Sequence, residues 1–135
     1  MIKKWPLATI TALFVASFSS LAGADNEAVS FKKDLVPILK TRCAVCHLTG
    51  QEAGRMALHP RAAYSNLVNI ESVEVAGMKR VSPYQPEASY LMHKLLGSHL
   101  DVGGTGTQMP FGSQPLSSGE IDRFTRWISE GAADN

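Results

Sequence analysis

The sequence predicts a small all-α domain of three to five helices joined by long loops. Apolar residues recur at helical spacing in several short segments, and no alternating apolar and polar run of useful strand length lies between them. The length of 135 residues suits one domain, and a hydrophobic content of 44% provides enough apolar surface for a core. The only candidate for β-structure is a short pair around Val73 to Val75.

Residues 1–24 have the features of a secretory signal peptide and are not expected to belong to the fold. Two lysines form a positive start, an apolar run follows from Trp5 to Phe18, and small residues end the segment at Ala24. An uncleaved membrane anchor is the alternative, but the apolar run is shorter than the roughly 20 residues that span a bilayer. We expect cleavage after Ala24, which leaves residues 25–135 as one domain.

The charge and the predicted export limit the classes of partner. Loss of the two lysines of the signal peptide lowers the formal net charge of the chain from +1 to −1. A chain without a surplus of Lys and Arg cannot neutralise a run of phosphates, so a general nucleic-acid binder is excluded. No other segment is apolar enough to span a membrane, and we expect a monomer in the periplasm or otherwise outside the cytoplasm.

The first predicted helix covers Ser30 to Arg42. Its apolar residues recur at helical spacing, with lysines and arginine between them; they are Phe31, Leu35, Ile38 and Leu39. Pro37 interrupts the segment, because proline lacks the backbone N–H that a helix interior needs. The helix is therefore either kinked at Pro37 or properly begins just before it.

Two shorter helices are predicted in the middle of the chain. The first covers Arg61 to Val68, where Tyr64, Leu67 and Val68 share one side. The second covers Glu87 to Leu96, with leucines one turn apart and Gly97 placed to end it.

The last predicted helix, from about Ser118 to Glu130, has the clearest local signals. Ser117 and Glu120 have the spacing of a capping box, and Leu116 and Ile121 are placed to form a hydrophobic staple. Its apolar face carries Ile121, Phe124, Thr125 and Ile128, with Trp127 beside it, and Gly131 follows as the residue that ends the helix.

A long irregular segment, Ser98 to Pro115, precedes this last helix. Three glycines cluster near its middle, and Met109-Pro110 and Pro115 stiffen its end. Long irregular loops in small domains are usually functional or disordered. Prolines after a flexible tract indicate a segment that holds something in place.

The chain has only two cysteines, Cys43 and Cys46, and they form a C-x-x-C-H sequence with His47. This is the attachment signature of a covalently bound haem. Two thiols on one helical turn can reach the two vinyl groups at one edge of the porphyrin as thioethers, and the adjacent imidazole can bind the iron as proximal ligand. The sequence therefore predicts one haem c.

Other interpretations of the two cysteines remain open. A thioredoxin-like redox pair belongs next to a βαβ pattern, which is absent from the sequence. A structural zinc site needs four ligands, and no second pair of ligands has the required spacing. A structural disulfide is possible in an oxidising compartment.

The chain resembles a class I c-type cytochrome, similar to the single-haem domains of many exported bacterial proteins. The resemblance covers most of the mature chain. It rests on the C-x-x-C-H motif and on weaker matches, namely Phe31, Pro37-Ile38-Leu39, Ser89-Tyr90-Leu91, Lys94-Leu95, Gln108-Met109-Pro110, Pro115-Leu116-Ser117, Glu120-Ile121, Trp127-Ile128 and Gly131-Ala132.

The resemblance implies a small cytochrome c fold around one covalently attached haem. It implies that the first and last helices cross beside the haem, with Phe31 against Phe124 or Trp127. It also implies that a methionine from the loop before the last helix is the distal iron ligand, and the matching residue is Met109. The sequence agrees, since Met109 lies in the one long stiffened loop.

Rival distal ligands have simpler roles. Met92 falls within a predicted helix, where core packing is expected. Met56 lies too close to the attachment site to cross to the other face, and Met78 lies in a polar turn. The histidines His59, His93 and His99 are alternatives for a bis-histidine site.

The leading hypothesis is a periplasmic electron carrier with no catalytic residue, in which His47 and Met109 saturate the iron. Its partners would be redox proteins. The first alternative is a small haem enzyme, of peroxidase or sulfur-oxidising type, with an open or labile sixth position. The second is a thiol oxidoreductase or a disulfide-stapled binding module.

Four cationic residues are candidates to contact haem propionates, although ordinary solvated charges are the simpler interpretation: Arg55, Arg61, Lys79 and Arg80.

Overall fold

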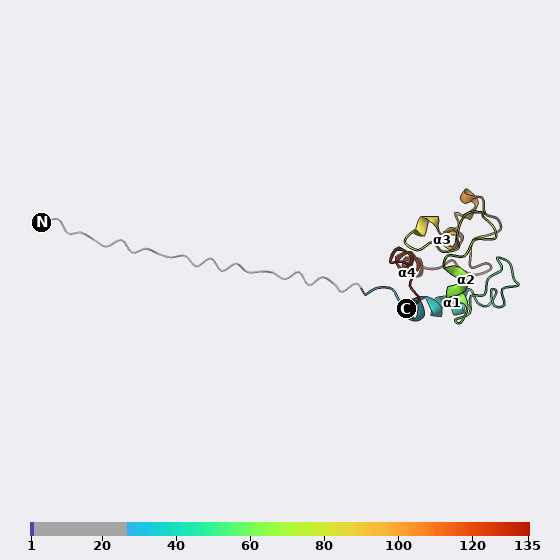
Figure 1. Cartoon of the computed structure of the whole chain (residues 1–135), viewed down its shortest axis with the longest axis horizontal. Coiled ribbons are helices and arrows are strands. Elements are labelled where there is room, and N and C mark those ends of the chain that lie inside the picture. The colour runs from blue at the N-terminus through green and yellow to red at the C-terminus, as the bar shows by residue number, and fades with distance from the viewer. Residues whose placement is uncertain (2–26) are drawn as a thin grey trace.

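The structure is a computed structural model that describes Met1 and residues 27–135 (Figure 1). The predicted signal peptide, residues 1–24, lies outside the described residues apart from Met1. The described part contains four α-helices and three short turns of other helix types: η1 (Phe31–Leu35), α1 (Val36–Arg42), α2 (Ala63–Leu67), η2 (Pro86–Ala88), α3 (Tyr90–Leu96), η3 (His99–Val102) and α4 (Ser118–Ser129). None of these helices is both long and apolar enough to cross a membrane.

The prediction of an all-α domain is confirmed for the described residues. They contain no strand and only isolated β-bridges, of which Glu71 with Lys79 is antiparallel. The predicted short pair around Val73 to Val75 is therefore displaced: the bridge flanks this segment, which is itself a bend. The bridges close a loop between α2 and α3.

Pro37 determines where the first α-helix begins. Before it, η1 is a π-helical turn in which the Val36 N–H donates to the Phe31 carbonyl. The α-helix α1 starts at Val36 and places Pro37 in its first turn, where the missing N–H would have no helical partner. Of the two sequence alternatives, the start just before the proline is the one observed. Ser30 caps η1, with its hydroxyl accepting from the Lys33 N–H at 3.2 Å.

The helix predicted over residues 87–96 is interrupted at Ser89, so this prediction was wrong at its N-terminal end. Ser89 has extended backbone angles and is fully buried. Its hydroxyl accepts from the Ser82 N–H at 2.9 Å and donates to the Gln85 carbonyl at 2.8 Å. These bonds compete with the helix, which leaves η2 before the interruption and α3 after it. Gly97 ends α3 with a left-handed φ of 81°, as predicted.

The other two predicted helices are present with small changes at their ends. α2 is shorter than the predicted span of residues 61–68. α4 has the predicted capping box: the Ser117 N–H donates to the Glu120 carboxylate at 2.8 Å, and the Glu120 N–H donates to the Ser117 hydroxyl at 3.3 Å. Gly131 follows the C-cap Glu130 with a φ of 106°.

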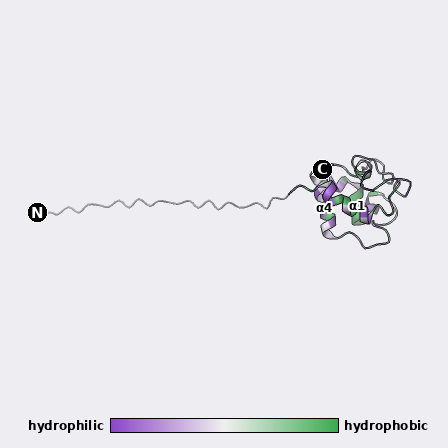
Figure 2. Cartoon of the chain, turned by 90° about the horizontal axis from the view of Figure 1, so that it is seen from below, coloured by the Kyte–Doolittle hydropathy of each residue, from purple (hydrophilic) through white to green (hydrophobic). Residues whose placement is uncertain are grey.

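The core joins the two ends of the segment formed by residues 27–135. The rings of Phe31 and Trp127 lie 5.0 Å apart between centroids, which confirms the expected contact between the first helical segment and α4. Tyr64 of α2 meets Phe31 edge-on at 5.4 Å. The Lys32 N–H donates to the Asn135 carbonyl at 2.9 Å, so the C-terminus lies beside the start of η1 (Figure 1). Both α1 and α4 carry hydrophobic and hydrophilic residues (Figure 2), as expected for helices with one buried face.

Candidate functional site

A mostly apolar cavity lies between the end of α1, helix α3 and the loops on either side of α2. It contains about 720 Å³ of empty space, a volume that includes open solvent. Its apolar lining includes Met56, Leu58, Leu67, Leu91 and Leu95. An outer hollow adjoins it and shares six lining residues, namely Arg42, Cys43, His47, Ala53, Met109 and Pro110.

The structure places three of the four predicted site residues at this cavity and the fourth at the adjoining outer hollow. Cys43, His47 and Met109 line both the inner cavity and the outer hollow, whereas Cys46 lines only the outer hollow. The turn that follows α1 brings Cys43, Cys46 and His47 together, since the Cys46 and His47 N–H groups both donate to the Cys43 carbonyl, at 3.1 and 2.9 Å. Cys43 is half-buried and Cys46 is exposed.

Burial controls the chemistry of the Cys43 thiol. It raises the pKa of Cys43 to about 11, and the positive charge of Arg42 offsets only part of this effect. Because the thiolate is the nucleophilic form, a thiol with this pKa is almost entirely protonated at neutral pH and is not activated for disulfide exchange.

His47 is a buried imidazole with an unpaired nitrogen. Only 9% of the residue is exposed, and Nδ1 is buried without a hydrogen-bond partner. Burial lowers the pKa of His47, against the opposing effect of the Glu52 carboxylate. The imidazole is therefore neutral at pH 7, the form in which histidine binds metals. Because a buried polar atom without a partner costs free energy, this ring is a candidate to interact with a group held in the cavity.

Two methionines line the cavity, which the sequence did not anticipate. Met109 lies on the loop before α4, as predicted, but Met56 also lines the inner cavity. The Met56 methyl and His47 Cε1 both lie within 4 Å of the position that a side chain at Gly54 would occupy, so Met56 lies near the imidazole. Met92 is 3% exposed and belongs to the core, as expected. Met78 lines neither hollow.

The three other histidines do not line the cavity. His93 contacts the Ser98 hydroxyl and the Glu87 carbonyl, each at 2.9 Å, through its two ring nitrogens. His99 is buried, with Nε2 3.1 Å from the Gly106 carbonyl. His59 accepts from the Arg61 N–H at 3.3 Å. Each histidine has a local structural role.

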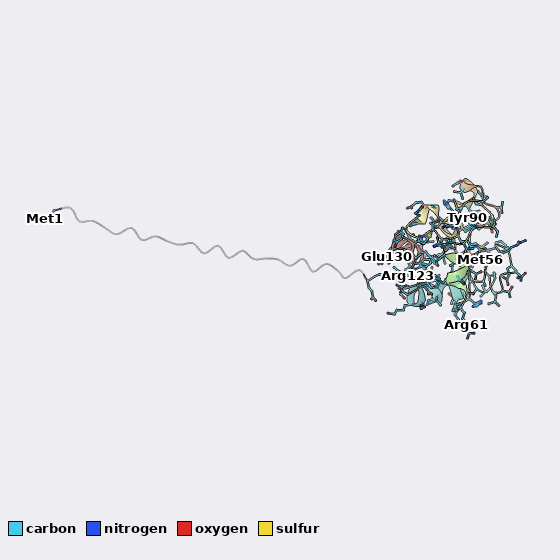
Figure 3. All side chains as sticks on the ribbon, viewed as in Figure 1. Met1, Met56, Arg61, Tyr90, Arg123 and Glu130 are labelled. Atoms are coloured by element: carbon cyan, nitrogen blue, oxygen red, sulfur yellow. The ribbon has the colours of Figure 1, made fainter. Side chains whose placement is uncertain are left out.

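Arg80 is a buried cation at the wall of the cavity. It is 7% exposed and donates to three backbone carbonyls, those of Asn66, Gly54 and Arg55, at 2.7, 2.9 and 3.0 Å. Burial lowers the pKa of its guanidinium. No carboxylate of the described residues lies within ion-pair distance of it. Arg80 therefore differs from the other three cations that were candidates to contact propionates. Lys79 donates to the Asn69 side chain, and Arg55 and Arg61 are exposed (Figure 3 labels Arg61).

A polar cluster at the same cavity was missed by the sequence analysis. Lys94 of α3 is 8% exposed, and its ammonium lies 3.6 Å from Glu74 and donates to the Thr105 carbonyl at 2.8 Å. The Tyr90 hydroxyl also donates to Glu74. The sequence contained one sign that Lys94 is buried. Leu91, Lys94 and Leu95 share one helical face, which places a lysine on an otherwise apolar surface.

The charged side chains that line the cavity carry a net positive charge, and we call them the positive wall. Arg42, Arg80 and Lys94 line the cavity against a single carboxylate, Glu74. Burial alone would raise the pKa of Glu74, but hydrogen bonds from Tyr90 and Thr105 and the charge of Lys94 outweigh it and hold the pKa below its ordinary value. Glu74 is therefore ionised at neutral pH. The lining accordingly favours a ligand that is largely apolar and carries anionic groups.

Comparisons with protein-family models, curated proteins and solved structures find no match to this chain. The described residues also contain no group of three or more His, Cys, Asp or Glu side chains arranged to hold a metal ion. The functional assignment therefore depends on the residues of the cavity.

Proposed function

We propose that this chain is an exported mono-haem c-type cytochrome that carries single electrons between redox proteins in the periplasm. The observation that supports it best is that Cys43, His47 and Met109 line one mostly apolar cavity, with Cys46 at the outer hollow that adjoins it. Two thiols, an imidazole and a thioether, drawn from segments far apart in the sequence, are the donor set of a covalently attached haem with two protein ligands. A small cytochrome c fold is part of this proposal.

The cavity residues fit this group. A haem attached here supplies an iron that alternates between the ferric and ferrous states. Cys43 and Cys46 would hold the porphyrin through thioethers, His47 would provide the proximal nitrogen, and Met109 the distal sulfur. The apolar lining would exclude water, and the positive wall would favour the two anionic propionates.

Arg80 is our candidate for a propionate partner. Its three carbonyl acceptors fix the guanidinium in place, but none of them neutralises its charge. An anionic group in the cavity would supply that missing charge, and hydrogen bonds between ionised groups are the stronger kind.

The thiol-oxidoreductase alternative is less well supported by the same residues. Cys43, with its pKa raised to about 11, is not an activated thiolate and would not itself start thiol exchange at neutral pH. An electron carrier and a haem enzyme differ in whether the sixth position of the iron is occupied.

Carbon monoxide binding tests this difference. We expect the reduced wild-type protein to bind carbon monoxide slowly or not at all, and the oxidised protein to show the weak near-infrared band of sulfur ligation. In Met109→Leu, the band should disappear and carbon monoxide should bind rapidly. Met56→Leu is the matched control and should retain the wild-type behaviour.

Two outcomes would contradict the proposal in different ways. Rapid carbon monoxide binding to the wild-type protein would favour the haem enzyme over the carrier. Loss of the near-infrared band in Met56→Leu, with retention in Met109→Leu, would show that the distal iron ligand is Met56, the second methionine of the cavity, and not Met109.

A further inference from the structure

The segment that carries Met109 is bonded to the carboxyl end of α3. The Met109 N–H donates to the Lys94 carbonyl at 2.9 Å, and the Gln108 side-chain amide donates to the Leu95 carbonyl at 2.7 Å. Both carbonyls belong to the last turn of α3, where backbone acceptors have no partner within the helix. The loop therefore supplies hydrogen bonds that α3 lacks, and α3 fixes the position of the loop.

The Gln108 side chain reaches this position because Gly97 leaves room for it. A Cβ atom at Gly97 would lie 3.1 Å from both Cδ and Oε1 of Gln108, closer than most real contacts. Gly97 also has a left-handed φ of 81°, which ends α3. The same glycine thus terminates the helix and admits the amide that bonds to its last turn.

The Gln108 bond is the side-chain contact closest to Met109 along the loop. Upstream, Lys94 bonds to the Thr105 carbonyl at 2.8 Å and His99 lies 3.1 Å from the Gly106 carbonyl. Downstream, Pro110 has no N–H to donate. The next hydrogen bonds from the described domain to this loop are those of Arg42 to the carbonyls of residues 114 and 115.

We propose that Gln108 is a positioning residue that keeps the Met109 sulfur directed at the cavity and so maintains the sixth ligand of the iron. This inference rests on the proposed function. Without the amide bond, Met109 would be held by its own backbone N–H and by contacts of its side chain. The state with Met109 displaced would then become more populated, and an external ligand that needs this state would bind more tightly.

Imidazole binding to the oxidised, haem-loaded protein measures this population. Gln108→Glu retains the shape of the side chain but removes the donor, so we expect the apparent dissociation constant for imidazole to fall about fivefold, the factor that corresponds to a hydrogen bond worth about 1 kcal/mol. Gln114→Glu is the matched control. It makes the same charge change in the same loop, at a residue that is exposed like Gln108 but whose side chain makes no hydrogen bond in the described structure, and should leave imidazole affinity unchanged.

A neutral second variant, Gln108→Leu, separates the loss of the donor from the added charge and should show the same tighter binding. Imidazole affinity within twofold of wild type in both Gln108 variants, while the wild type retains its near-infrared sulfur band, would overturn the positioning role alone. A wild-type protein without haem, or without the sulfur band, would overturn the proposed function and this inference with it.

Discussion

Glu74 provides the sharpest test of the polar cluster at the cavity. Its carboxylate accepts from the Tyr90 hydroxyl, lies 3.6 Å from the Lys94 ammonium and accepts from the Thr105 N–H at 3.3 Å. The side chains of Lys94 and Glu74 are 10% and 24% exposed. Glu74→Gln retains the shape and an acceptor oxygen but removes the charge opposite a buried ammonium.

The magnitude follows from the geometry of the ion pair. Two charges 3.6 Å apart at an effective dielectric constant of about 20 attract by roughly 4 to 5 kcal/mol. Part of this is retained in the variant, because Lys94 still donates to the Thr105 carbonyl and the glutamine keeps a dipole. Water also reaches the partly exposed carboxylate. We therefore expect the free energy of unfolding to fall by about 2 kcal/mol at pH 7.

The effect should depend on pH in a stated direction. Because the pKa of Glu74 is lower in the folded chain than its ordinary value of 4.5, the charged carboxylate stabilises the fold above that value. This contribution is lost as the pH falls through the lowered pKa. The difference between wild type and Glu74→Gln should therefore shrink below about pH 4.5 and vanish in stronger acid.

Urea unfolding of the haem-loaded protein, followed by far-ultraviolet circular dichroism, measures both quantities. Glu71→Gln is the matched control, because Glu71 is exposed and lies on the same loop without a side-chain partner in the described structure. A Glu74→Gln variant within 0.5 kcal/mol of wild type at pH 7 would refute the reasoning. A difference that stays constant with pH would refute its electrostatic basis.

Three further substitutions test other parts of the structure. Ser117→Ala removes the capping box and should lower the free energy of unfolding by about 1 kcal/mol in urea titrations, and no change would contradict its capping role. Gly104→Ala would place a Cβ atom 2.7 Å from the His99 carbonyl oxygen and against the Tyr90 hydroxyl, so it should lower the melting temperature, whereas an unchanged melting temperature would show that the loop relaxes freely. Arg80→Leu leaves three backbone carbonyls without their donor and should cost about 3 kcal/mol in urea titrations, and full stability in Arg80→Lys would show that the forked guanidinium is not required.

The helix predictions succeeded where the signal was local. The capping box at Ser117 and the helix ends at Gly97 and Gly131 depend on hydrogen bonds and backbone angles within a few residues. The residue types at neighbouring positions are therefore enough to predict them. The interruption at Ser89 was not predictable from periodicity. It depends on hydrogen bonds to Ser82 and Gln85 that form only because the chain turns there.

The candidate site could be predicted in part for a similar reason. The spacing of Cys43, Cys46 and His47 is local, and the irregular loop drew attention to Met109. The polar cluster of Glu74, Tyr90 and Lys94 brings together separate segments, so no sequence window contains it. Of the four cations considered as propionate partners, Arg80 is the one that is buried and lines the cavity, and neither property can be read from the sequence.

The position of Met56 adds a detail that the sequence did not provide. Proximity to the C-x-x-C-H motif suggested that Met56 lies too close to reach the far side of a haem. The structure places it in the cavity lining near His47, as a neighbour of the imidazole. Distance along the chain therefore did not exclude Met56 from the cavity.

Covalent attachment of haem is the central claim, and denaturing electrophoresis followed by a haem stain tests it most directly. The protein should be produced in cells that export it and attach haem to C-x-x-C-H sequences. We expect the wild-type band to stain, because thioether-linked haem survives denaturation, and the Cys43→Ser/Cys46→Ser variant to remain unstained. A wild-type band that carries no stain under these conditions would contradict the proposed function.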